Sequence, residues 1–369
     1  MSAPAWRNAA NVLCVRLDSL GDVLMCTPAM RAIKQSRPGR RLTLLTSGSG
    51  ASAAPFIPEL DAVLAYPAPW MKGNPGPPGN SGNSGNAAER GAAMIALLAS
   101  YRFDAAVIFT SFSQSALPAA LMCHLAGIPA RLAHCRENPY QMLSDWVVES
   151  EPEQIVRHEV QRQLDLVASV DWHASCSRLS FSVPALAMRA VQANLAQHGI
   201  GARQPFILLH PGASAPSRRY PPALWAQVIM QLAQRTAWPL VLTGEAREAA
   251  LIEEIRSASG VAVLSLAGQL DLGQLGAAIK LASVVVSNNT GPAHMAAALG
   301  TPLVDLYALT NPQHTPWQVD SRLLFHDVPC KFCYKSVCPQ GHNNCLSKIA
   351  PQRVVEAVRS LMWHAAAST

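Results

Sequence analysis

Short apolar segments alternate with longer amphipathic ones along most of the chain. Apolar runs of about four to eight residues favour buried strands, and apolar residues spaced three and four apart favour helices. Predicted strands cover residues 12–17, 41–45, 62–65, 104–109, 206–210, 239–243, 261–264, 283–287 and 302–307. Predicted helices cover residues 23–35, 89–100, 157–168, 223–234, 292–299 and 352–364. This alternation predicts parallel sheets with helices on both faces.

The pattern of strand and helix begins twice, near residue 12 and near residue 206. At roughly 100–200 residues per domain, 369 residues make about two domains. We therefore expect an α/β protein with two Rossmann-like domains, residues 1–185 and 186–350, and a C-terminal helix at 351–369. Residues 71–88 are rich in Gly, Pro, Asn and Ser, which predicts a flexible surface loop.

Composition and charge narrow the class of protein. Apolar residues make up 50% and charged residues 14%, which excludes wholesale disorder. No run approaches the roughly 18–20 apolar residues of a membrane-spanning helix, and the N-terminus has no secretory apolar region, so a cytoplasmic protein is expected. The net charge of +6 fits anionic small molecules or an anionic membrane surface better than nucleic acid.

The first segment with candidate chemistry follows the first predicted strand, where open α/β sheets bind ligands. Gly21 is expected to permit a tight turn, and Asp22 lies at the start of the next helix. Two interpretations of Asp22 stay open: a helix N-cap, or a general base toward a substrate hydroxyl, with Ser19 and Gly21 beside it at the cleft floor. The glycine motifs of dinucleotide and P-loop sites are absent from the sequence.

Two further segments each follow a predicted strand in the second half. Arg218 and Arg219 precede a helix, and their guanidinium groups suit phosphate oxygens, although a solvated surface loop is the alternative. Thr290 and Gly291 open another helix, whose free N–H groups suit a diphosphate. Within that helix His294 is either packed or in contact with the ligand.

These three segments carry a resemblance that spans nearly the whole chain. The matching text is VRLDSLGDV at residues 15–23, HPGA at 210–213 with RRYP at 218–221, and NTGPAH at 289–294. It resembles glycosyltransferase family 9, heptosyltransferase-like enzymes with the GT-B fold, in which the parallel sheets of two Rossmann-like domains face each other across a cleft. The resemblance implies inverting transfer of a sugar, usually heptose from an ADP-sugar, to a hydroxyl of a lipopolysaccharide-type acceptor.

The resemblance also assigns residues and partners. It implies that Asp22 is the general base, that Arg218 stands where a phosphate-binding Lys is common, and that Glu245 or Glu248 contacts the ribose of the donor. Asn289, near the donor sugar, stands where many relatives carry Asp, which leaves the donor open. The implied partners are a nucleotide-sugar donor and a glycan or glycolipid acceptor, with peripheral contact to the inner membrane, no nucleic acid and no catalytic cofactor.

Four cysteines crowd together near the C-terminus. Their thiolates are close enough in sequence to close a tetrahedral site, and the resemblance includes relatives that hold iron on such cysteines. A structural zinc or iron site is one interpretation, and reduced thiols or a local disulfide are the others. Four thiolates leave no open position for catalysis. The four residues are Cys330, Cys333, Cys338 and Cys345.

Two other functions stay open at the level of sequence. A nucleotide-sugar epimerase shares the two-domain fold but needs no acceptor site. A non-catalytic binding module would use the cysteine-rich segment for a partner and the sheets as a scaffold.

Overall fold

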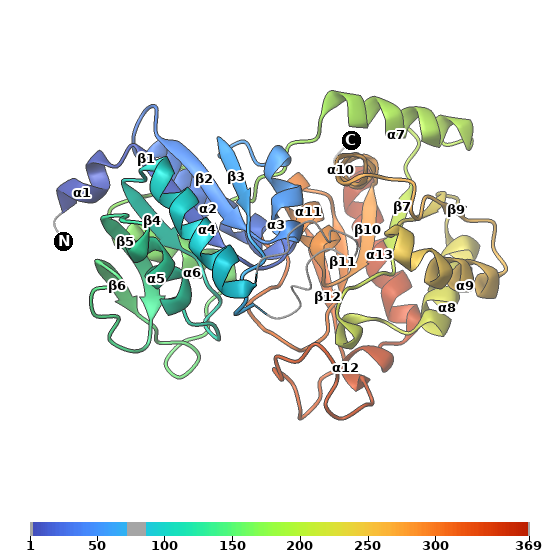
Figure 1. The fold of residues 1–369 in the computed structure, drawn as a ribbon. Helices are drawn as coiled ribbons and strands as arrows, with labels where there is room; N and C mark the ends of the chain where they lie inside the picture. Colours follow the sequence, from blue (N-terminus) through green and yellow to red (C-terminus); the bar gives the residue numbers. More distant parts are fainter. Residues whose placement is uncertain (1–2, 72–85, 368–369) are drawn as a thin grey trace. The chain divides into compact units, whose positions relative to one another are not determined.

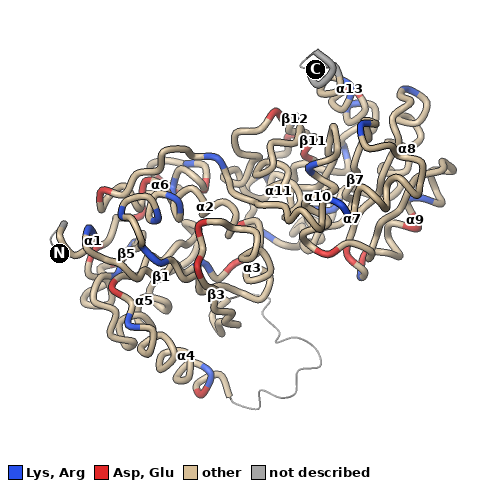
Figure 2. Tube along the Cα trace, turned by 90° about the horizontal axis from the view of Figure 1, so that it is seen from above, with Lys and Arg blue, Asp and Glu red and all other residues tan. Residues whose placement is uncertain are grey.

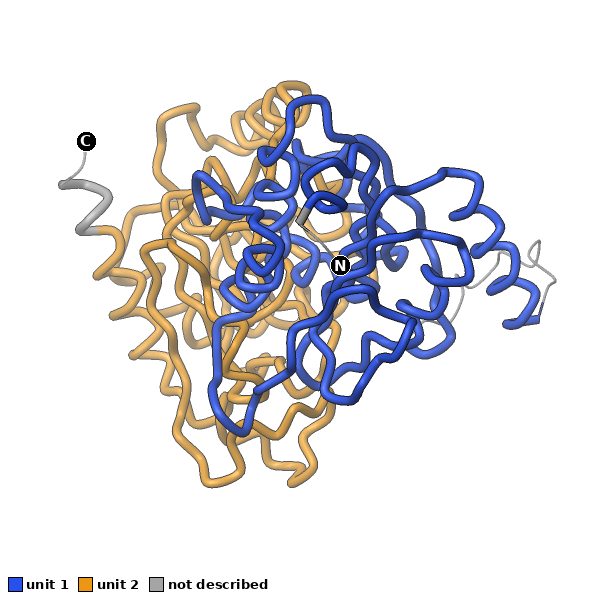
Figure 3. The backbone as a smooth tube through the Cα atoms, turned by 90° about the vertical axis from the view of Figure 1, so that its left-hand side faces the viewer, with its two compact units in different colours: residues 1–180 blue, residues 181–369 orange. Residues whose placement is uncertain are grey.

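The computed structural model describes residues 3–71 and 86–367, and most of the loop predicted at residues 71–88 lies outside the described residues. The chain separates into two compact units, residues 1–180 and 181–369 (Figure 3). Charged residues are sparse along both units (Figure 2). None of the described helices combines the length and the apolar character that crossing a membrane requires.

The first unit is built on a six-stranded parallel sheet with the order β3-β2-β1-β4-β5-β6 (Figure 1). Its strands are β1 (Asn11–Arg16), β2 (Arg41–Thr46), β3 (Ala62–Ala65), β4 (Ala105–Ile108), β5 (Ala130–Cys135) and β6 (Asp145–Val148). Its helices are α1 (Ala3–Asn8), α2 (Leu20–Gln35), α3 (Gly48–Ala53), η1 (Ala54–Phe56), α4 (Ala87–Tyr101), α5 (Leu117–Leu125) and α6 (Glu159–Ala168).

The second unit repeats this architecture with the order β12-β11-β10-β7-β8-β9. Its strands are β7 (Ile207–His210), β8 (Leu240–Leu242), β9 (Leu264–Ser265), β10 (Val284–Asn288), β11 (Leu303–Leu306) and β12 (Ser321–Leu324). Its helices are α7 (Ala185–Gln197), η2 (Pro216–Arg218), α8 (Pro222–Arg235), η3 (Ala246–Glu248), α9 (Ala249–Ser259), α10 (Leu272–Leu281), α11 (Gly291–Leu299), α12 (Asn344–Ser347) and α13 (Pro351–Ala367).

Both sheets have the Rossmann strand order, so each has one point where the chain reverses direction across the sheet. In the first unit this switch point lies between β1 and β4, and in the second between β7 and β10. Ligands of open α/β sheets bind outside the carboxyl ends of the strands at such points. The two switch points therefore locate the candidate sites.

The buried faces explain why the two sheets form. In β1 every residue after Asn11 is buried, and apolar helix faces cover such strands from both sides. The C-terminal helix α13 belongs to the core of the second unit, because Val354, Val355, Val358 and Leu361 pack with the strands there. The predicted separate C-terminal helix is thus, as α13, part of the second layered unit.

Some elements differ from the sequence prediction. Helix α2 begins at Leu20, three residues before the predicted start at residue 23, because Ser19 already has the extended backbone of an N-cap. Strands β5 and β6 were not predicted from the pattern. In β5, Arg131 and His134 interrupt the apolar run, yet both are buried and bond to backbone carbonyls. Strand β9 covers only the end of the predicted segment 261–264 and one residue beyond it.

Candidate functional site

At the switch point of the first unit, Asp22 occupies the third position of helix α2, and Ser19 is the N-cap. Oδ2 of Asp22 accepts from the backbone N–H of Ser19 at 3.1 Å and from its hydroxyl at 2.6 Å. Of the two interpretations of Asp22, the one that makes it the N-cap is therefore wrong. Gly21 is buried inside the first helical turn and does not form the expected tight turn.

Arg16 lies beneath this segment and is fully buried. Its Nε lies 2.7 Å from Asp18, its Nη2 3.2 Å from Asp22 and its Nη1 2.5 Å from Glu159. Burial opposes the charge of the guanidinium, but the carboxylates of Asp18 and Glu159 outweigh it and raise the pKa of Arg16. One buried cation thus organises three carboxylates.

The Asp18 carboxylate of this cluster has an unusual pKa. Burial raises the pKa of Asp18 to about 6, although Arg16 and a hydrogen bond from Gln114 act in the opposite direction. The sequence analysis did not select Asp18, Arg16 or Glu159 as site residues. Glu159 lies 143 positions from Arg16 in the chain, and no local signal marks that pairing.

At the switch point of the second unit, Asn288 joins the ends of β10 and β7. Its Nδ2 donates to the carbonyl of Pro211 at 2.7 Å, and its Oδ1 accepts from the backbone N–H of Tyr220 at 3.1 Å. One buried amide therefore holds both ends of the arginine-containing segment 211–221. The sequence analysis did not assign Asn288 a role, although the adjacent pair of asparagines at a strand end was a visible signal.

Arg218 is half-buried at the end of η2, and Arg219 is exposed with its Nε donating to the carbonyl of Ala213 at 2.8 Å. Burial raises the pKa of Asp305 to about 7, opposed by a hydrogen bond from Asn289 and by the charge of Arg218. The charge of Arg218 is therefore close enough to act on the carboxylate of Asp305 in strand β11.

Asn289 is buried, and its Nδ2 donates to Asp305 at 2.9 Å and to the carbonyl of His314 at 3.0 Å. The amide nitrogen of Asn289 thus makes its hydrogen bonds within the protein, to Asp305 and to the backbone at His314. Thr290 is the N-cap of α11, and Gly291, rather than Pro292, takes the first helical position. His294 is buried within the same helix.

Glu245 and Glu248 lie in different environments. Glu245 is exposed and pairs with Arg247 at 2.6 Å. Glu248 is buried, accepts from the N–H of Glu245 at 2.9 Å, and packs so closely on Gly212 that a Cβ there would lie 2.2 Å from the carboxylate. The structure therefore brings Glu248, but not the Glu245 side chain, against the segment that carries Arg218.

The four clustered cysteines lie near one another, but their side chains are not arranged around a metal ion. Burial raises the pKa of Cys345, and the charges of Cys338, Cys333 and Cys330 raise it further. Over residues 3–71 and 86–367, no three His, Cys, Asp or Glu side chains are arranged to hold a metal ion. The expected structural metal is therefore not confirmed.

Two Rossmann-like units, each with charged side chains at its switch point, define a ligand-binding α/β protein whose candidate sites lie at the carboxyl ends of its strands. The family model described as glycosyltransferase family 9 (heptosyltransferase) matches residues 93–343. The chain belongs to this family.

Individual relatives agree with the family assignment. The chain is 30% identical over 177 residues to lipopolysaccharide heptosyltransferase 2 of Escherichia coli K12. The aligned region covers 45% of this chain and 49% of that protein. The match thus spans about half the length of the relative.

Solved structures show the fold over nearly the full chain. A family 9 glycosyl transferase from Veillonella parvula is similar with a TM-score of 0.78 and 17% identity, covering 96% of this chain and 98% of that one. The E. coli ADP-heptose heptosyltransferase II is similar with a TM-score of 0.70 and 22% identity, covering 96% and 99%. The fold is GT-B.

Proposed function

We propose that this protein is an inverting glycosyltransferase that moves a sugar from a nucleoside-diphosphate donor to a hydroxyl of a glycan acceptor. The observation that carries the proposal is the complementary chemistry of the two switch points. The first unit presents the carboxylates of Asp18 and Asp22, held by Arg16. The second presents Arg218 on a segment that Asn288 anchors.

In the proposed reaction Asp22 removes the proton of the acceptor hydroxyl as its oxygen attacks the anomeric carbon. The new C–O bond forms on the face opposite the diphosphate, and the bond from the anomeric carbon to the diphosphate oxygen breaks. The nucleoside diphosphate leaves with the bonding electrons, so one displacement inverts the anomeric centre. The proton stays on Asp22 until solvent removes it.

The leaving diphosphate gains negative charge during this step. Arg218 and Arg219, together with the N–H groups at Thr290 and Gly291, are proposed to stabilise it. Asn289, directly after β10, and His294, within α11, would line the donor site. Glu248 is better placed than Glu245 for the ribose because it packs on Gly212. No cofactor takes part in the proposed transfer.

The donor and acceptor are proposed from the relatives. The E. coli proteins are named for ADP-heptose and lipopolysaccharide, which supports heptose from ADP-heptose and a lipopolysaccharide or related glycan as acceptor. Such an acceptor would bring the enzyme to the cytoplasmic face of the inner membrane, and the net charge of +6 favours that contact.

Two measurements test the proposal. A thermal-shift series of nucleotides and nucleotide sugars should show the largest stabilisation by ADP and ADP-heptose. Product analysis by NMR, with and without a deacylated lipopolysaccharide core oligosaccharide, should show a new glycosidic bond of inverted configuration only when the oligosaccharide is present.

The same measurements separate the alternatives. An epimerase would convert the nucleotide sugar without the oligosaccharide, and a non-catalytic module would bind no nucleotide sugar. Membership of glycosyltransferase family 9 favours transfer over both.

We propose that the four clustered cysteines stabilise the fold and take no part in the sugar transfer. Cys330 and Cys345 pack against a small apolar cluster of Tyr307, Leu309 and Val328. A zinc or iron ion on the four cysteines would tie the segment 330–345 to this cluster, with no step of the reaction at the metal.

A further inference from the structure

The turn that carries Arg218 is too short to hold its own position. η2 spans three residues, and two backbone bonds close it, from the N–H groups of Arg218 and Arg219 at 3.0 and 3.2 Å. Asn288 anchors residues 211–221 at their two ends. Because so short a turn forms few hydrogen bonds of its own, contacts from elsewhere in the fold decide where Arg218 stands.

The cysteine-rich segment, residues 330–345, supplies such contacts. Ser217, in the middle of η2, is buried with 3% of its surface exposed. Its hydroxyl donates to the backbone carbonyl of Lys335 at 2.8 Å, and its N–H donates to that of Ser336 at 3.0 Å. Both bonds come from one residue, so Ser217 is the point at which the turn is fixed to this segment.

The cysteine-rich segment is also bonded to the loop after β11. The N–H of Phe332 donates to the carbonyl of Leu309 at 2.6 Å, and that of Tyr334 to the carbonyl of Thr310 at 2.8 Å. Phe332 and Tyr334 have left-handed backbones with φ of 60° and 52°, which residues other than glycine adopt where surrounding contacts compel them. Their side chains are exposed, so the backbone bonds rather than ring burial account for this conformation.

The cysteine-rich segment therefore connects the ends of two strands that flank a third. In the second sheet β10 lies between β7 and β11 (Figure 1). The turn η2 follows β7, residues 309–310 follow β11, and Thr290 opens the helix that follows β10. The segment thus links the structures on both sides of the N–H groups at Thr290 and Gly291, which are proposed to bind the diphosphate.

The guanidinium of Arg218 lies within electrostatic reach of the end of β11. Burial raises the pKa of Tyr307, just after β11, above its usual range, and the charge of Arg218 opposes that rise, as it does at Asp305. Arg218 therefore starts from the β7 side of the sheet and acts on the β11 side. A shift of η2 would move its charge relative to Thr290, between these two sides.

We propose that Ser217 is a positioning residue for the donor diphosphate: by fixing η2 to the backbone of the cysteine-rich segment, it holds the Arg218 guanidinium where the phosphate oxygens bind. The inference rests on the proposed function, in which Arg218 contacts the diphosphate. Ser217 acts through Arg218 and not by touching the substrate. The carbonyls of Lys335 and Ser336 receive its bonds, and no thiol takes part.

The test compares ADP with adenosine by calorimetric titration of the full chain. Ser217→Ala removes the hydroxyl bond to Lys335, so the affinity for ADP should fall about three- to tenfold, the range of one typical hydrogen bond. The affinity for adenosine should stay nearly unchanged, because adenosine has no phosphate for Arg218 to contact. Ser217→Thr keeps a hydroxyl and should recover part of the ADP affinity. Equal losses for ADP and adenosine in Ser217→Ala would overturn the proposal.

Ser259→Ala is the matched control. Ser259 is buried to the same extent, 3%, and its hydroxyl also donates to a backbone carbonyl, that of Arg256, at 2.7 Å. It lies at the end of α9, outside both residues 211–221 and the cysteine-rich segment. Ser259→Ala should therefore leave the affinity for ADP unchanged. The same loss of ADP affinity in Ser217→Ala and Ser259→Ala would refute a specific role of Ser217.

Hydrogen exchange measures the anchoring of the turn without a ligand. In Ser217→Ala the N–H groups of Arg218 and Arg219 should exchange about three- to tenfold faster than in the parent protein, because the turn opens more often. The N–H groups of α8 should keep their rates. Unchanged exchange at Arg218 and Arg219 would show that the hydroxyl does not anchor the turn, and the proposal would fail.

Parallel titration of Arg218→Ala separates this proposal from the proposed function. If Arg218→Ala weakens binding of ADP and Ser217→Ala does not, the positioning proposal fails and the proposed function stands. If neither ADP nor ADP-heptose binds the parent protein, the glycosyltransferase proposal fails, and the role of Ser217 in donor binding fails with it even where hydrogen exchange shows the anchoring.

Discussion

Nη2 of Arg16 donates to Oδ1 of Asp22 at 3.2 Å, so a fully buried cation contacts the carboxylate proposed as the base. This bond holds one oxygen of Asp22, and the backbone N–H and hydroxyl of Ser19 orient the other. Three testable consequences concern this cluster and the second switch point, a fourth concerns the four clustered cysteines and a fifth a buried histidine.

Asp22→Asn should lower the rate of sugar transfer by about 10²–10⁴, the usual contribution of a positioned general base. The Asn amide oxygen still accepts from Ser19, so the melting temperature and the affinity for ADP should stay nearly unchanged. Steady-state transfer rates and calorimetric titration with ADP measure these effects. Asp171→Asn, at an exposed position, is the control. A variant as fast as the parent would limit Asp22 to its role in the first turn of α2.

Arg16→Met should destabilise the protein by about 3–5 kcal/mol, because it leaves the fully buried Glu159 and its neighbours without a counter-charge. Arg16→Lys should be intermediate, since one ammonium group does not reach all three carboxylates as the guanidinium fork does. Urea denaturation measures both variants. Arg178→Met, at an exposed position in the same unit, should change little. Equal stability of Arg16→Met and this control would contradict the prediction.

Arg218→Ala should weaken binding of ADP more than binding of adenosine, because the guanidinium is proposed to contact phosphate oxygens. The loss should be about 1.5–3 kcal/mol, roughly ten- to a hundredfold in affinity. Arg218→Lys should recover part of it, and added salt should shrink the difference. Arg235→Ala, at the exposed end of α8, is the matched control. Equal losses for ADP and adenosine would indicate a disturbed loop at residues 211–221 instead.

The described structure does not arrange the four cysteines around an ion, so metal binding requires their thiolates to move together. We expect that they do, because four thiolates within a short segment can reach tetrahedral coordination, and that protein purified under reducing conditions without chelator contains about one zinc or iron ion per chain. Elemental analysis measures the content. Cys333→Ser should lower both the metal content and the melting temperature, whereas Cys176→Ser, at an exposed cysteine outside the cluster, should change neither. Well-folded protein free of both metals would leave reduced thiols or a disulfide at residues 330–345.

His210 should make stability depend on pH. Burial lowers the pKa of His210 to about 4, below the ordinary value of 6.5. The unfolded chain therefore binds this proton first as the pH falls, so the contribution to stability is present above about pH 6.5 and declines toward pH 4. Between pH 7 and pH 5 the loss should be about 2 kcal/mol.

Urea denaturation at pH 7 and pH 5 measures this loss. His210→Gln should remove that part of the pH dependence, and His173→Gln, at an exposed position, should retain it. An unchanged slope in His210→Gln would mean that other groups cause the pH dependence.

Much of the architecture could be predicted from local patterns. Apolar runs such as residues 12–17 and 283–287 are long enough to require burial, and their alternation with amphipathic segments leaves little choice but parallel layered sheets. The motifs around Asp22, Arg218 and Asn289 sit directly after such runs, so their place at strand ends also followed from the sequence. These features depend on neighbours a few residues away.

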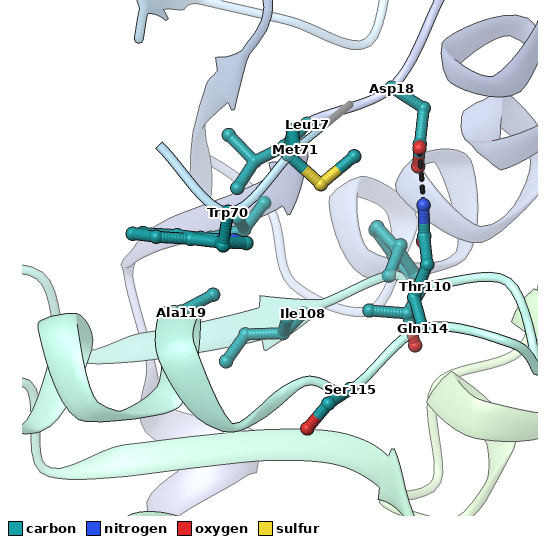
Figure 4. Close-up of a pocket in the computed structure, with 11 residues that line it drawn as sticks. Leu17, Asp18, Trp70, Met71, Ile108, Thr110, Gln114, Ser115 and Ala119 are labelled. Carbon is teal, nitrogen blue, oxygen red and sulfur yellow. Dashed lines mark hydrogen bonds between the residues drawn. The ribbon is translucent and has the colours of Figure 1, made fainter. Parts of the chain in front are cut away.

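Only the tertiary structure decided which of these residues meet. The contact of Arg16 with Glu159 spans 143 positions, and that of Gln114 with Asp18 spans 96. The sequence cannot show that the amide nitrogen of Asn289 donates to Asp305, or that Glu248 packs on Gly212. Nor can it show that Trp70 lies across from Asp18 and Gln114 (Figure 4). Each depends on strand order and register, which bring distant residues to one sheet edge and leave no trace in local composition.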